Sequence, residues 1–258
     1  MKVNQIISSF YQNNIGMQGN GLYIHEESEV SGIKNIKGEY LFQSKYNIET
    51  YYNYFILKTS AKFKNRKIII IDKDGKSIYS EALKSSRNIF PVNNYLIAEE
   101  DKKSGRNTFF RLRNLKTKET SERIYSKVYN EVNGLIKVRK YIKKDGEFKW
   151  GFINTNFETV IDFIYSNEPG GFIENRILVK SKNKKFGFID EKGKLVIEPT
   201  YIKAFDFVNS KALVRIHRKK YLANKKVNYG YRIIDANGKI IQDLENMKLS
   251  NNYSKENP

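Results

Sequence analysis

The 258-residue chain contains no cysteine, a single tryptophan and only two histidines. Without cysteine it has no disulfide framework, no thiol nucleophile and no cysteine-ligated zinc site. No stretch approaches the roughly 18 apolar residues of a membrane-spanning helix. The first residues are interrupted by Asn4, Gln5, Ser8 and Ser9 and lack the continuous apolar core of a secretion signal. We therefore expect a cytoplasmic protein that does not associate with a membrane.

What the chain has in excess is positive charge. Lys and Arg number 47 against 28 Asp and Glu, which gives a formal net charge of +19. Hydrophobic residues make up 40% of the chain, so a folded core is expected rather than disorder. A chain of this length forms one large domain or two small ones, and its charge favours negatively charged partners.

One short pattern recurs along the whole chain: an apolar strand that ends at an Asp or Asn. Such a side chain opens a tight turn by accepting hydrogen bonds from backbone N–H groups ahead of it. The six anchor residues are spaced by 36 to 45 residues, about 40 on average. They are Asn35, Asp72, Asn114, Asn154, Asp190 and Asp235.

A glycine three residues after the anchor provides the positive φ that lets the chain reverse. Four copies have it, as Gly38, Gly75, Gly193 and Gly238. Thr117 and Phe157 stand at that position in the other two copies. We expect a different turn geometry, or a shifted register, in those two copies.

Each repeat predicts three strands: one that ends at the anchor, one after the turn, and a third farther on. The third strands are short β-branched and aromatic runs at residues 54–57, 95–98, 135–138, 177–179 and 212–214. Units of about 40 residues with three or four strands have the size of propeller blades. The predicted fold class is all-β, a repeat array of about six three- to four-stranded units.

We expect these units to form a six-bladed propeller-like ring closed by an N-terminal strand. The unit after Asp235 lacks a third strand, and residues 21–24 lie where such a strand is expected before the first anchor. Pairing the two would remove exposed sheet edges. An open or clam-like meander is the alternative. The predicted domains are an N-terminal arm (1–19), one β-repeat domain (20–242) and a polar C-terminal tail (243–258).

Two segments resemble a known family. Residues 149–154 (KWGFIN) and 185–201 (KFGFIDEKGKLVIEPTY) are similar to the WG, or KWG, β-repeat of bacterial proteins. The resemblance is strong over about 149–215 and weaker elsewhere, and only Trp150 retains the tryptophan. It implies an all-β repeat array and no particular chemistry.

Basic residues concentrate between the third strand of one unit and the first strand of the next. The groups lie at 62–67, 102–106, 139–144, 182–185 and 215–226. If each unit has an even number of strands, these hairpin tips share one face; with three strands, successive tips alternate between faces. Residues 203–205 are a candidate for the additional strand.

The predicted function is that of a non-enzymatic β-repeat interaction protein that presents loops and basic hairpin tips to a macromolecular partner. We favour a protein partner, with the chain as an adaptor or inhibitor of a nucleic-acid-processing complex. Direct RNA or DNA binding is the alternative, with aromatics such as Tyr141 stacking on bases. A basic surface that merely reflects composition is also compatible with the sequence. The predicted partner-binding residues are Lys62, Lys64, Arg66, Lys67, Arg139, Lys143, Lys144, Lys182, Lys184, Lys185, Arg215, Arg218, Lys219 and Lys220.

No motif predicts catalysis, a cofactor or a metal. His217 alternates with Arg215 on the polar face of a strand, with no carboxylate near it in sequence to orient it as a base. The segment 75–77 ends like a phosphate-binding loop but lacks the earlier glycine. The segment 72–75 begins like a calcium loop but lacks the later ligands. We therefore expect no catalytic, cofactor-binding or metal site.

Overall fold

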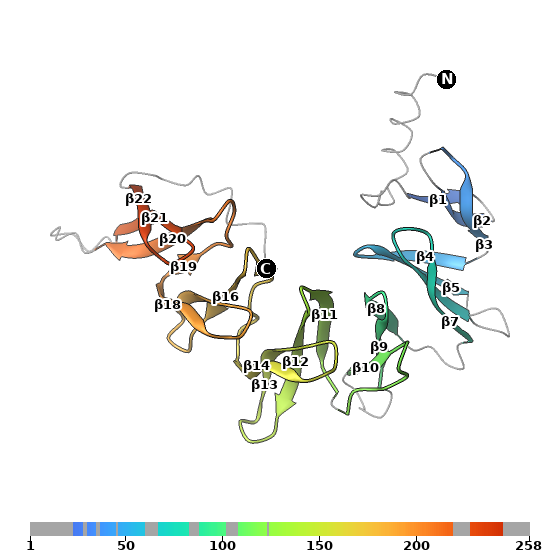
Figure 1. Cartoon of the computed structure of the whole chain (residues 1–258), viewed down its shortest axis with the longest axis horizontal. Coiled ribbons are helices and arrows are strands. Elements are labelled where there is room, and N and C mark those ends of the chain that lie inside the picture. Colours follow the sequence, from blue (N-terminus) through green and yellow to red (C-terminus); the bar gives the residue numbers. More distant parts are fainter. Residues whose placement is uncertain are drawn as a thin grey trace. The chain divides into compact units, whose positions relative to one another are not determined.

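The computed structural model of the chain (Figure 1) consists of β-strands wherever it defines regular structure. It describes residues 23–27, 30–34, 37–44, 46–59, 67–82, 88–101, 108–122, 124–218 and 228–244. Within these residues the strands form six antiparallel sheets of three or four strands, which confirms the predicted all-β class. The chain divides into two compact units, Met1–Ile124 and Tyr125–Pro258, and each is described separately.

The first unit contains three sheets. The first sheet comprises β1 (Tyr23–Glu27), β2 (Val30–Lys34) and β3 (Tyr40–Ser44). The second comprises β4 (Tyr46–Tyr51), β5 (Tyr54–Thr59), β6 (Lys67–Ile71) and β7 (Ser77–Ala82). The third comprises β8 (Ile89–Asn93), β9 (Leu96–Glu100) and β10 (Phe110–Asn114), with β9 in the middle.

The middle sheet of the first unit is buried on both faces. Phe55 and Leu57 of β5 pack with Ile33 of the first sheet. Ile56, which points to the opposite face of the same strand, packs in a cluster with Ile97 of the third sheet. A strand that is covered on both faces has a continuous apolar run in its sequence, and β5 and β6 have such runs.

The second unit contains three four-stranded meanders. The first comprises β11 (Lys127–Val132), β12 (Leu135–Ile142), β13 (Glu147–Ile153) and β14 (Thr159–Tyr165). The second comprises β15 (Phe172–Ile173), β16 (Arg176–Lys180), β17 (Phe186–Ile189) and β18 (Leu195–Tyr201). The third comprises β19 (Lys203–Ala204), β20 (Lys211–Arg218), β21 (Asn228–Asp235) and β22 (Ile240–Leu244).

These three sheets pack in chain order, so the β15–β18 sheet lies between the other two. Phe152 and Ile161 of the first sheet form one core cluster with Ile189 of the second. Phe188 of the second sheet forms another cluster with Val214 of the third. Adjacent residues of β17 thus contact different neighbours, as alternation along a strand requires.

The predicted anchor turns are present in every described copy. In the clearest copy, the Asp190 Oδ1 atom accepts hydrogen bonds from the backbone N–H groups of Lys192 (2.9 Å) and Lys194 (2.8 Å). Gly193, between them, has a φ of 79°. Equivalent side-chain contacts are made by Asp72, Asn114, Asn154 and Asp235. Asn35 lies outside the described residues.

The two copies without the glycine solve the turn in different ways. Phe157 itself takes the positive φ (67°), and its N–H donates to the Asn154 carbonyl over 3.1 Å, as the Gly193 N–H does to Asp190. After Asn114 the positive φ instead falls on Lys118 (67°), whose N–H donates to the Asn114 carbonyl. The first turn therefore keeps the common geometry despite its bulky residue, and the second is longer.

The glycine after the aromatic residue of the repeat has a separate role. Pairing of β17 with β18 shifts register between Phe186 and Phe188, so β18 bulges directly over Gly187. A Cβ atom on Gly187 would lie 2.7 Å from the Pro199 nitrogen, and closer still to the Ile197 carbonyl oxygen. Only glycine leaves room for a backbone this close.

The predicted closure by an N-terminal strand is not confirmed. Strand β1, which includes Tyr23 and Ile24, pairs with β2 in the first sheet. The last sheet already has four strands without it. The reason is that the third strand of each sequence repeat pairs through the basic hairpin with the first strand of the next repeat, so every sheet combines two repeats. A closed ring stays a prediction, and the predicted arm 1–19 lies outside the described residues.

Candidate functional site

The basic hairpins of the second unit turn at the same end of their own sheets. In a four-stranded meander the middle hairpin lies at one end and the two outer hairpins at the other. We call the end with the middle, basic hairpins the tip end, and the end with the Asp and Asn turns the turn end. The pairing of Lys203 and Ala204 with β20 provides the even strand number that the sequence left open.

Two of these tips are described completely. Lys143 and Lys144 are exposed on the hairpin between β12 and β13, and Lys182 and Lys184 are exposed on the hairpin between β16 and β17. Lys185, at the base of the second tip, is half-buried. Within the described part of the chain, none of these five lysines forms an ion pair with a carboxylate.

The two tips lie close to each other. A hydrogen bond from Lys149 lowers the pKa of the Asp145 carboxyl on the first tip, and the charges of Lys144 and Lys182 lower it further. Lys182 belongs to the second tip, so its charge reaches across to the first. Of the two alternatives that the sequence leaves open, the four-stranded sheets of this unit have the even strand number, the alternative in which successive tips share one face.

The backbone of each tip requires one residue with a positive φ. On the first tip this is Gly146 (67°), whose N–H donates to the Ile142 carbonyl over 2.9 Å. On the second tip it is Lys184 (60°), whose N–H donates to the Ser181 carbonyl over 2.9 Å. A lysine in this conformation is strained, whereas glycine is not.

Arg139 and Arg215 lie within strands rather than on the tips, which corrects their predicted placement. The Arg139 guanidinium lies 4.8 Å from the ring centre of Phe148 and 5.7 Å from that of Trp150. The Arg215 guanidinium lies 4.7 Å from the ring centre of Tyr229. In both sheets the arginine contacts aromatic side chains of the paired strand. The positions of the arginines in the sequence alone do not reveal these contacts.

The remaining predicted partner-binding residues lie outside these two tips or outside the described residues. Lys67 is the exposed first residue of β6 in the first unit. Arg218 is the last residue of β20, and its side chain is not described. The other predicted residues, Lys62, Lys64, Arg66, Lys219 and Lys220, lie outside the described residues.

Lys137, in contrast to the tip lysines, is held by structural contacts within the second unit. Its Nζ atom donates to Glu168 Oε1 (2.8 Å) and to the Pro169 carbonyl (3.0 Å), and lies 4.3 Å from the ring centre of Tyr129. Sequence reasoning did not single out this residue, because its partners come from a different segment. Its charge is already matched, unlike that of the tip lysines.

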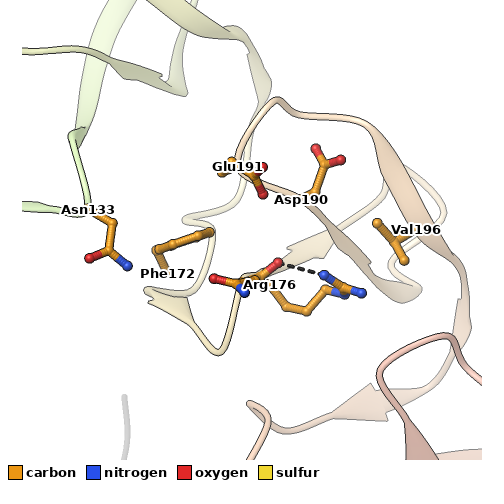
Figure 2. A pocket seen from close by; sticks show the side chains of 7 residues that line it. Asn133, Phe172, Arg176, Asp190, Glu191 and Val196 are labelled. Atoms are coloured by element: carbon orange, nitrogen blue, oxygen red, sulfur yellow. Dashed lines mark hydrogen bonds between the residues drawn. The ribbon is translucent and has the colours of Figure 1, made fainter. Parts of the chain in front are cut away.

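A pocket of about 620 Å³ opens at the turn end of the second unit (Figure 2). The lining residues are Asn133, Phe172, Asn175, Arg176, Asp190, Glu191 and Val196. Arg176 donates to the Asn175 carbonyl (2.8 Å) and, through Nε and Nη2, to the Ala236 carbonyl. Asp190 accepts the hydrogen bonds of its own turn, so two of the three charged lining residues, Arg176 and Asp190, already serve the scaffold.

Among the described residues, no group of three or more His, Asp or Glu side chains is placed to hold a metal ion. No helix within the same residues has the length and apolar character needed to cross a membrane.

Comparison with known proteins identifies the repeat. The family model described as the WG containing repeat matches residues 150–185 and 186–221. The first match spans the segment from β13 to β16, and the second begins with β17 and includes β20. The resemblance seen in the sequence is confirmed for these two segments, each of which matches one WG repeat.

Other comparisons give only distant similarity. No curated protein matches the chain. An uncharacterized protein from Listeria monocytogenes is 15% identical, with a TM-score of 0.47, over 88% of this chain and 80% of that one. The β-propeller domain of the Trilobed protease from Pyrococcus furiosus is 10% identical, with a TM-score of 0.39, over 88% of this chain and 81% of that one. These values assign no function.

Proposed function

We propose that the chain is a non-enzymatic β-repeat interaction protein whose tip end, in the second unit, binds a negatively charged macromolecule. One observation carries the proposal: two neighbouring hairpins present exposed lysines, none of which forms an ion pair among the described residues. The adaptor or inhibitor role expected from the sequence fits such a surface and is part of the proposal. The surface lies on loops held by a rigid sheet scaffold, where binding residues are commonly found.

The local carboxylates offset only part of the positive charge of these lysines. Asp145 and Glu147 both bind Lys149, over 2.9 Å and 3.1 Å, at the base of the first tip. Lys143 and Lys144 therefore remain available to a partner. Because exposed charges are screened over about 8 Å at physiological salt, the tips act as a short-range surface whose binding weakens with salt.

Paired variants of one sheet test this proposal. Lys182→Gln with Lys184→Gln removes two charges from the tip end of the β15–β18 sheet. Lys192→Gln with Lys194→Gln removes two exposed charges from the turn end of the same sheet. We expect capture of a partner from host lysate to be lost with the first pair and retained with the second. Equal capture by both variants would exclude the tips.

We also propose that the six sheets close into a propeller-like ring. The face-to-face packing of consecutive sheets inside each unit supports this arrangement. A crystal structure tests it directly, and one in which the first and last sheets make no contact would contradict closure.

A further inference from the structure

Two of the three sheets in the second unit carry a pair of rings at the tip end. Tyr141 and Phe148 lie opposite each other on β12 and β13, with ring centres 5.3 Å apart. His217 and Tyr229 take the corresponding positions on β20 and β21, with ring centres 5.5 Å apart. Tyr141 and Tyr229 are 48% and 47% exposed, so each offers part of its ring to a ligand.

Each ring pair is backed by an arginine. Arg139 lies over Phe148 and Arg215 over Tyr229, and within the described residues neither arginine forms an ion pair. The Nε atoms of both are buried without a hydrogen-bond partner. A guanidinium next to a ring keeps its charge and its N–H donors, the groups by which arginine binds a phosphate.

The sheet between these two carries lysines in the same sequence register. Lys182 takes the position of Tyr141, because each lies two residues after the equivalent basic residue, Lys180 or Arg139. Lys184 takes the position of Phe148, because each lies two residues before the equivalent aromatic residue, Phe186 or Trp150. At this register position the three packed sheets therefore carry, in order, a ring pair, a lysine pair and a ring pair. The first ring pair stands beside the exposed Lys143 and Lys144 of its own tip. A surface that only needed charge, or only solubility, would not require this alternation.

Alternating flat rings and negative charges are the chemistry of a single nucleic acid strand. Its bases stack on exposed aromatic side chains, and its phosphates contact lysines and arginines. A duplex hides the faces of its bases, and an acidic protein surface has no comparable row of rings. We infer that the tip end of the second unit binds single-stranded nucleic acid, with Tyr141 and Tyr229 stacking on bases and Lys182 and Lys184 contacting phosphates. This inference rests on the proposed function, because it uses the same surface and adds the chemical class of the partner.

Fluorescence anisotropy with the full chain tests the inference. The probes are a labelled oligothymidine of about 20 nucleotides, the matching duplex, and inorganic polyphosphate as a polyanion without bases. At about 50 mM salt we expect the single strand to bind more tightly than the duplex. Tyr141→Ala with Tyr229→Ala should weaken oligothymidine binding about five- to 100-fold and leave polyphosphate binding unchanged. Tyr141→Phe, which keeps the ring, should bind like the wild type.

The charge variants complete the test. Lys182→Gln with Lys184→Gln should weaken both oligothymidine and polyphosphate binding. It should also reduce the slope of log affinity against log salt by about 1.4, because two phosphate contacts are lost. Lys192→Gln with Lys194→Gln, at the turn end, should change neither affinity nor slope.

The possible outcomes separate this inference from the proposed function. Absence of oligothymidine binding at about 50 mM salt, or tyrosine variants that bind it normally, would overturn the inference. If polyphosphate or an acidic protein still binds in a manner that depends on Lys182 and Lys184, the proposed function stands alone. If the lysine pair affects no ligand, the proposed function fails as well.

Discussion

Replacing Gly187 with alanine tests why this repeat needs a glycine beside its aromatic residue. A methyl group there would lie 2.7 Å from the nitrogen and 2.8 Å from the Cα atom of Pro199, distances that Cβ atoms do not tolerate. Both atoms are backbone, so β18 must move away rather than a side chain rotating. Overpacking of this kind costs about 1–3 kcal/mol, and we expect a loss near 3 kcal/mol because the strand pairing is disturbed too.

Two other glycines provide matched controls. Gly146 has a φ of 67° and nothing within 4 Å of a Cβ atom, so alanine there should cost only the left-handed conformation, about 1 kcal/mol. Gly193 has a φ of 79° and places its Cβ 3.2 Å from the Ile161 side chain, which adds a small packing cost. The expected order of destabilisation is Gly146→Ala, then Gly193→Ala, then Gly187→Ala.

Urea unfolding followed by tryptophan fluorescence measures this order. Trp150 is the single tryptophan of the chain, is 5% exposed and lies in the second unit, as do all three glycines. Because the chain has two compact units, the comparison uses midpoints at equal slopes rather than one global free energy. A Gly187→Ala midpoint as high as that of Gly146→Ala would refute the explanation based on the bulge.

Two further predictions concern single side chains of the second unit. Burial raises the pKa of the Asp206 carboxyl from 3.8, although the charge of Lys137 acts in the opposite direction. The carboxyl therefore contributes stability below pH 3.8, and this contribution is lost as the pH rises through the folded-state pKa. Asp206→Asn should therefore raise the melting temperature at pH 7 and lose that advantage near pH 3; no gain at pH 7 would contradict this. Lys184→Gly should raise the stability of the second unit by about 0.5–1 kcal/mol in urea unfolding, because it relieves a positive φ, while weakening polyanion binding. A less stable variant would show that Lys184 is not strained.

The local features of the fold were predictable from the sequence. The Asp190 side chain holds residues at most four positions ahead of it, so its turn depends on a short segment that any copy of the repeat displays. The apolar runs that form β12, β16 and β20 are likewise local signals. Their confirmation follows from the physics of turns and short strands, which act over a few residues.

The pairing of strands was not predictable in the same way. Each sequence repeat contains three strong strands, but the sheet takes its third strand from the preceding repeat, which reassigned the strand near Tyr23 from the last sheet to the first. The two-residue strand at Lys203 and Ala204 was too short to assign with certainty. Phe157 has a positive φ, although bulky residues prefer a negative φ. The turn geometry shared by the repeats overrides that preference.

The candidate surface was recognised by charge and completed by structure. The recurrence of basic residues in one slot of the repeat predicts Lys143, Lys182 and Lys184. The ring pairs that flank them depend on which residue of one strand faces which residue of the next, and this register became available only with the hairpins in place. The sequence indicates Tyr141 as a stacking residue, but it does not indicate the partner Phe148.

The scaffold itself does not explain why the tips differ from one another. The three sheets of the second unit share the same strand order and the same anchor contact, so a purely structural requirement would favour similar side chains at equivalent tip positions. Instead, one register position holds Tyr141 and His217 in the outer sheets and Lys182 in the sheet between them. Exposed positions can vary without a cost to the core, and here the variation produces an ordered alternation of rings and charges. That alternation is the reason to expect a ligand with the same alternation.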